Sequence, residues 1–187
     1  MDQSVSTMER LGRFPWRPVG WSLAGLLLIL PLIAMRFTDE VNWTGRDFLA
    51  AALMLGGTGL AMELTLTRFK DLRYALAWVL VLSSALLLLW INLAVGILGA
   101  EDHPANAWFL AIFAMGLLGA LASRLRPVGM ARTMLAVAAT QFVLLAIGIA
   151  AVPGDVLKTV ILNGLFIAAW LISAALFFRA ARPTTAE

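Results

Sequence analysis

Residues 74–100 read YALAWVLVLSSALLLLWINLAVGILGA, a run of 27 residues without one charged side chain. A membrane-spanning α-helix needs about 20 consecutive apolar residues, and a helix buried in a soluble core is usually shorter. Five comparable runs fill most of the remaining chain, at residues 18–35, 48–67, 104–123, 133–154 and 159–178. The pattern therefore predicts an all-α polytopic membrane protein, a bundle of six transmembrane helices.

The overall composition agrees with this class. Of the 187 residues, 61% are hydrophobic and 13% are charged, whereas soluble domains are about 45–50% apolar and about 25% charged. The absence of cysteine excludes disulfides, thiolate metal sites and a cysteine nucleophile. His103 is the single histidine, which excludes a bis-histidine haem and disfavours a zinc centre. We therefore expect no cofactor and no bound metal.

The runs predict one membrane domain with short tails. An N-terminal arm covers residues 1–17, the transmembrane domain residues 18–178, and a tail residues 179–187. The helices are expected at about residues 18–36, 46–67, 74–100, 106–123, 131–152 and 158–178. Arginines precede the first run, as in a signal peptide. However, no small-residue cleavage site follows, so we interpret the run as a retained first span.

Charge alternates along the connectors between the runs. Lys and Arg gather in the N-terminal arm, in residues 68–73, in residues 124–132 and in the tail, and acidic residues gather in the other three connectors. Lys and Arg accumulate in short cytoplasmic connectors, so both termini are predicted to be cytoplasmic and the acidic connectors external. Topology accounts for the net charge of +3, and the expected partner is the lipid bilayer rather than nucleic acid.

Glu63 is the one ionisable residue inside an apolar run, where it lies close to the predicted cytoplasmic boundary. An ionisable group within a span is a candidate functional site. The favoured interpretation is an ion pair with Arg68, Arg124 or Arg132 that locks the second helix to its neighbours. The alternative is a carboxylate that accepts a proton or a cation at the inner mouth of a path.

A second set of polar residues lies near the external ends of the predicted helices. Its members are Arg36, Asp47, Asn92, Asn106 and Asn163. In one bundle, these residues would line an outward-facing polar pocket. The favoured interpretation, however, is that the amides hydrogen-bond across helices and only hold the helices together. Gln141, near the middle of the fifth run, raises the same question.

The external connectors carry acidic residues and the single histidine: Asp39, Glu40, Glu101, Asp102 and His103. Carboxylates with one imidazole would suit a hard divalent cation. The spacing matches no defined metal motif, so a solvated acidic face is the favoured interpretation. In the first connector, Thr44 and Asp47 also form an approximate capping box for the second helix.

Small residues mark the helix faces that are expected to pack, because they let helix backbones approach closely. Gly56 and Gly59 share one face of the second helix, and Gly116 and Gly119 belong to the fourth. A short similarity between residues 93–97, LAVGI, and residues 145–149, LAIGI, also permits a duplicated hairpin. Chance is the favoured explanation, since these residue types are common throughout the chain.

Two stretches resemble a known family. The first is FTDEVNWT at residues 37–44, followed by Asp47 and Phe48, and the second is WINLAVGI at residues 90–97, which leads into residues 101–106. Together they resemble a family of small, uncharacterised multi-pass inner-membrane proteins of proteobacteria. The resemblance implies a bacterial inner membrane and a compact helical membrane fold. It implies no activity, cofactor or catalytic residue.

Three functions remain open at this point. The favoured one is a non-enzymatic accessory or structural component of the bacterial inner membrane, in a larger membrane complex or as a homo-oligomer. The alternative is a small oligomeric transporter or channel for an ion or a small solute. A membrane-embedded enzyme comes third, since the sequence contains no defined catalytic constellation.

Overall fold

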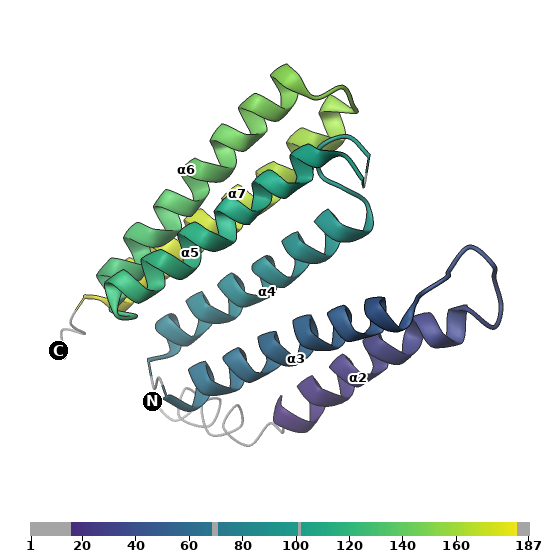
Figure 1. Ribbon diagram of the computed structural model, residues 1–187. Coiled ribbons are helices and arrows are strands. Elements are labelled where there is room, and N and C mark those ends of the chain that lie inside the picture. Colours follow the sequence, from purple (N-terminus) through teal and green to yellow (C-terminus); the bar gives the residue numbers. More distant parts are fainter. Residues whose placement is uncertain (1–15, 69–70, 101, 183–187) are drawn as a thin grey trace, which may run out of the picture. The chain divides into compact units, whose positions relative to one another are not determined.

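The computed structural model describes residues 16–68, 71–100 and 102–182. Every regular element in these ranges is a helix: α2 (Trp16–Ala34), α3 (Gly45–Arg68), α4 (Leu72–Ala94), η1 (Pro104–Phe109), α5 (Leu110–Ser123), α6 (Pro127–Ala151) and α7 (Val156–Ala180) (Figure 1). Six helices are long and apolar enough to cross a membrane, with η1 and α5 counted as one. The prediction of an all-α polytopic membrane protein is therefore confirmed, and the orientation of its termini stays a prediction.

The chain divides after Glu63 into two units. We call the first the hairpin unit, which contains α2 and most of α3, and the second the four-helix unit, which contains α4 to α7 with η1. The single six-helix domain stays a prediction. Apart from the end of α4, helix boundaries lie within four residues of the expected ones.

A capping box begins α3 in the hairpin unit, as predicted. The carboxylate of Asp47 accepts hydrogen bonds from the backbone N–H and the hydroxyl of Thr44, both at 2.7 Å. An acidic residue in the first turn also complements the positive end of the helix dipole. Trp43 and Phe48 pack edge to face on either side of this cap, with ring centroids 5.2 Å apart. This pair is a hydrophobic staple, so local sequence alone accounts for the entry into α3.

Neighbouring helices run antiparallel in the four-helix unit (Figure 1). Helix α7 packs against both α4 and α6, and α6 packs in addition against α5. Helices α4 and α5 make no comparable contact with each other. The core of the unit is apolar and includes Leu88, Phe109, Met130, Trp170 and Phe177.

The third span departs from its predicted form. Helix α4 ends at Ala94, six residues before the end of the apolar run, because Gly96 and Gly99 adopt φ values of 69° and 71°. A Cβ atom on Gly96 would lie 2.6 Å from the Ala100 carbonyl oxygen, so only glycine fits this turn. The chain then folds back into the unit and buries Ile97 and Leu98, each 1% exposed. The predicted helix extended to residue 100 because the loop of residues 95–100 is as apolar as the helix before it, and hydropathy alone does not distinguish the two.

Glycines also allow close packing inside the four-helix unit. A Cβ atom on Gly119 of α5 would lie 2.3 Å from Thr133 of α6, so these two helices touch at a position that excludes any side chain. This confirms the predicted packing role of Gly119. Gly148, inside α6, receives Leu98 in the same way. Because Gly96 forms a turn and Gly148 is helical, the two similar pentapeptides differ in structure, which is evidence against a duplicated hairpin.

Candidate functional site

Asn106 holds the loop of residues 95–100 in place. This buried residue of η1 accepts hydrogen bonds on Oδ1 from the backbone N–H groups of Ile97 and Leu98, both at 3.0 Å. Its Nδ2 group donates to the Ala100 carbonyl oxygen at 2.8 Å. One amide side chain thus supplies the partners that a helix would have supplied to this backbone. Irregular backbone is tolerated at membrane depth where protein groups satisfy it in this way.

Asn92 connects α4 to the same structure. Its Nδ2 group donates to the backbone carbonyl oxygen of Asn106 at 3.1 Å. Its Oδ1 atom is buried and has no hydrogen-bond partner among the described residues. Asn92 and Asn106 are therefore brought together, and the Asn92 Oδ1 atom is a buried acceptor without a partner among the described residues.

A second polar network lies deeper, between α6 and α7. Gln141 donates from Nε2 to Oδ1 of Asn163 at 3.2 Å and accepts from Nε1 of Trp170 at 2.6 Å. Asn163 donates in turn to the Thr159 carbonyl oxygen at 2.9 Å. The side chains of Gln141 and Asn163 are both 0% exposed. Such interhelical hydrogen bonds stabilise the packing of membrane helices.

The five residues of the predicted external pocket are thus distributed over different environments. Arg36 and Asp47 belong to the hairpin unit, where Arg36 is exposed and Asp47 caps α3. Asn92 and Asn106 meet each other, whereas Asn163 bonds to Gln141. All three asparagines lie in the four-helix unit. Asn106 and Asn163 bond to protein groups through both amide atoms, and Asn92 does so through Nδ2 alone. These bonds fit the favoured interpretation, in which the amides hold helices together.

Glu63 pairs with a residue that the sequence interpretation had assigned to the N-terminal arm. Its carboxylate forms an ion pair with Arg17 and accepts a hydrogen bond from Nε1 of Trp21 at 3.2 Å. The ring of Trp21 also lies over Gly59, 3.3 Å from the position of a Cβ atom there. Glu63 therefore fastens α3 to α2. The pairing could have been predicted from hairpin geometry, because Arg17 and Glu63 lie almost equally far from the connector.

The predicted acidic cluster has no metal-binding geometry among the described residues. Asp39, Glu40 and Asp102 are exposed, and Glu101 lies outside the described residues. His103 caps η1, with its Nδ1 atom accepting a hydrogen bond from the Ala105 N–H at 3.2 Å. No group of three His, Asp or Glu side chains in the described ranges is placed to hold a metal ion.

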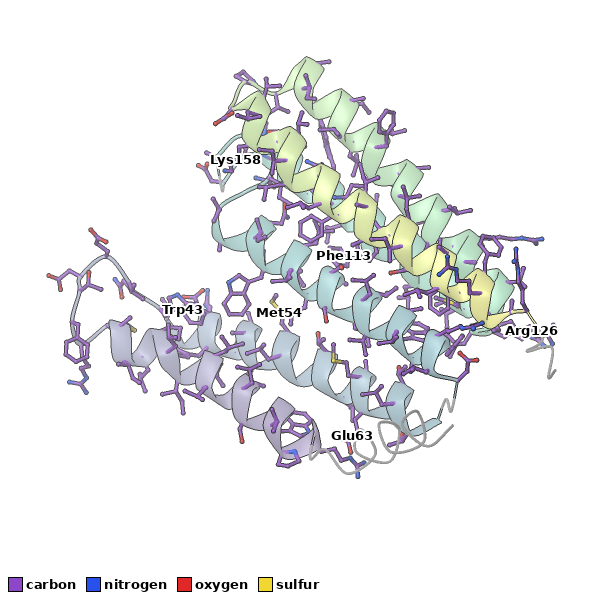
Figure 2. The ribbon with its side chains drawn as sticks, turned by 180° about the vertical axis from the view of Figure 1, so that it is seen from behind. Trp43, Met54, Glu63, Phe113, Arg126 and Lys158 are labelled. Atoms are coloured by element: carbon purple, nitrogen blue, oxygen red, sulfur yellow. The ribbon has the colours of Figure 1, made fainter. Side chains whose placement is uncertain are left out.

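An apolar groove was not predicted from the sequence. It lies between α4 and α5 in the four-helix unit, has a volume of about 210 Å³ and has its floor on α6 and α7. Its lining consists of Trp78, Val81, Ala85, Ile112, Phe113, Gly116, Leu117, Ala120, Met130, Met134, Val137 and Trp170. Phe113 is labelled in Figure 2 on the α5 wall. The small residues at positions 85, 116 and 120 were the available sequence signal, and of these Gly116 was interpreted as a site of helix contact.

Hydrogen bonds bridge the two walls of this groove beyond each of its ends. The hydroxyl of Tyr74 on α4 donates to the carbonyl oxygen of Leu125, in the turn that follows α5. At the opposite end, Asn92 on α4 donates to Asn106 on η1 at 3.1 Å. Helices α4 and α5 are therefore joined at their ends and separated between them, which leaves the groove open along its side.

Comparisons with protein-family models, with curated proteins and with solved structures find no match for this chain. The functional argument therefore depends on the geometry described above.

Proposed function

We propose that this multi-pass membrane protein is a non-enzymatic accessory or structural component of a bacterial inner membrane. The observation that supports this role is the use of the buried amides. Asn106, Gln141 and Asn163 form hydrogen bonds that close a loop or join two helices. A transporter for a polar solute needs such groups to face its path, whereas a structural protein needs them as interhelical contacts.

The proposed location and orientation have separate support. The alternation of basic and acidic connectors favours cytoplasmic termini, and the resemblance to small proteobacterial inner-membrane proteins favours the bacterial inner membrane. Because the chain contains no cysteine, single-cysteine variants provide a clean test. In whole cells, a membrane-impermeant maleimide should label Thr38→Cys, and it should label Arg182→Cys only after permeabilisation. The reverse pattern would overturn the orientation.

The alternative role, a small oligomeric transporter or channel, is favoured by one observation. The Oδ1 atom of Asn92 is a buried acceptor without a partner among the described residues. Buried polar atoms are usually satisfied by protein or by ordered water. A water molecule or a solute that donates a hydrogen bond would satisfy this atom, and it would then lie next to the Asn106 loop.

Native mass spectrometry distinguishes these roles. The protein would be extracted gently from its own membrane at natural abundance. A second protein in fixed stoichiometry is the expected result for an accessory component. A homo-oligomer without another protein would argue against that role. The transporter role would be established if, in addition, Asn92→Ala abolished solute flux in vesicles while the protein remained folded. Asn42→Ala is the matched control, because Asn42 is exposed in the first connector.

A further inference from the structure

The groove between α4 and α5 is deep and open along one side. On its floor, Met134 and Trp170 are each 2% exposed, whereas Leu117 on its rim is 63% exposed. Along α4 the groove extends from Trp78 to Ala85, which corresponds to about 10 Å at the rise of an α-helix. It is therefore an elongated groove that lies parallel to the helices and opens on one side of the unit.

The lining restricts the occupant to an apolar group. The residues that line the groove are apolar or aromatic, and apolar cavities of about 150 Å³ stay free of water and accept small hydrocarbons. A groove of about 210 Å³ is therefore unsuited to water and suited to a segment of hydrocarbon chain. For an open-sided groove in a membrane-spanning unit, lipid acyl chains are the most abundant hydrocarbon nearby.

Positive charge surrounds one end of the groove. Arg124 is four residues beyond Ala120 on α5, and Arg126 is four residues before Met130 on α6. Arg124 is the C-cap of α5 and Arg126 is the N-cap of α6, so both lie at the helix ends next to the groove. Figure 2 shows Arg126 at one end of the four-helix unit and Lys158 at the other. We call the Arg126 end the basic end.

The arginines at the basic end are available to a ligand. The exposed ones in the four-helix unit are Arg73, Arg124, Arg126, Arg132, Arg179 and Arg182. None of them forms an ion pair with a described residue of the chain. The acidic residue nearest to them in sequence, Asp71, accepts a hydrogen bond from the Tyr74 N–H at 2.8 Å and caps α4. The guanidinium group binds phosphate oxygens in a bidentate manner.

We propose that the groove holds one acyl chain of an anionic phospholipid, whose phosphate is bound by Arg73, Arg124 and Arg126. The lipid enters from the side, because the Tyr74–Leu125 hydrogen bond bridges the groove walls at the basic end. Basic pockets between membrane helices recognise anionic headgroups by the same combination of charge and apolar contact. The proposal does not depend on the accessory role, since a transporter would present the same groove.

Lipid titration followed by native mass spectrometry tests the proposal. The full chain is delipidated in a mild detergent and titrated with palmitoyl-oleoyl phosphatidylglycerol or with the matched phosphatidylcholine. Each Lys or Arg near a membrane surface strengthens anionic lipid binding about fivefold. We therefore expect the phosphatidylglycerol to bind one site at least about tenfold more tightly than the phosphatidylcholine. Equal affinities would overturn the headgroup part of the proposal.

Two pairs of variants separate the chain contact from the headgroup contact. Gly116→Leu fills the groove, because the nearest neighbour of a Cβ atom there is Val137 at 3.9 Å, and it should weaken binding of both lipids about tenfold. Its matched control is Gly164→Leu on α7, where a Cβ atom has no neighbour within 4 Å. Arg126→Gln should reduce only phosphatidylglycerol binding, by about fivefold, and Lys158→Gln at the opposite end should not.

A measurement on the unaltered protein removes the dependence on folded variants. Phosphatidylglycerol with a photoactivatable acyl chain should crosslink to groove residues such as Phe113 and Met134. Crosslinks confined to the outer surfaces of α6 and α7, or unchanged lipid binding in folded Gly116→Leu, would overturn the proposal. Loss of a bound protein from Gly116→Leu, with lipid binding unchanged, would instead assign the groove to a partner helix.

Discussion

Replacement of Asn106 by alanine should be among the most destabilising single changes in the four-helix unit. The change removes the acceptor of the Ile97 and Leu98 N–H groups, and both residues are 1% exposed, so water cannot replace it without opening the loop. A buried donor left without a partner costs about 1–3 kcal/mol. The two donors together should therefore lower the free energy of unfolding by about 2–6 kcal/mol. The Ala100 carbonyl adds little, because Ala100 is exposed.

This prediction is checked by unfolding the purified chain in mixed micelles with increasing mole fractions of SDS. Asn42→Ala is the control, since it deletes the same amide from an exposed connector position. Hydrogen–deuterium exchange supplies a local readout, because the amides of residues 97 and 98 should exchange much faster in Asn106→Ala. A loss below about 1 kcal/mol, with unchanged protection of these amides, would refute the assignment of Asn106 as the clamp of the loop.

Three further changes test the packing of both units, each followed by the same SDS titration. Gln141→Leu should cost about 1–3 kcal/mol, because it leaves buried Trp170 Nε1 without an acceptor; an unaltered midpoint would show that the network is dispensable. Gly119→Ala should destabilise by about 1–3 kcal/mol through its collision with Thr133, whereas Gly164→Ala should not; equal effects would exclude a steric cause. Glu63→Gln should cost less than about 1 kcal/mol, because its Arg17 partner is 54% exposed; a larger loss would indicate a more buried ion pair.

The difference between these expected effects has a functional meaning. Asn106 and Gln141 are buried and satisfied, so their removal should lower the amount of folded protein. Glu63 is a partly exposed ion-pair partner, so its neutral variant should fold, and any change in activity would then report on its charge. If the Glu63→Gln variant folds and behaves normally in cells, the role of the carboxylate is to link α2 to α3.

Local signals in the sequence were sufficient for some features of the structure. The capping box of Thr44 and Asp47 forms as predicted because its partners lie within one helical turn. The small residue at Gly119 marks a close helix contact because no side chain fits there. In each case the physical requirement involves either adjacent residues or the absence of a side chain, and both are visible in the sequence.

Other features required knowledge of which segments meet. Hydropathy predicted a continuous helix over residues 74–100, because an apolar loop and an apolar helix have the same transfer free energy. Only the contact with Asn106 shows that residues 95–100 form a buried turn. Likewise, the pairing of Glu63 with Arg17 depends on the antiparallel packing of α2 and α3.

The membrane class and the six spans are properties of the sequence itself, because the cost of placing polar groups in lipid acts on each segment separately. The partners of the buried amides and the groove between α4 and α5 are properties of the packed helices. They arise because Tyr74 and Asn92 join the ends of α4 to the neighbouring chain while the middles of α4 and α5 stay apart. The separation of α4 from α5 depends on side chains that lie far apart in the sequence. The residue pattern of a single segment therefore does not predict it.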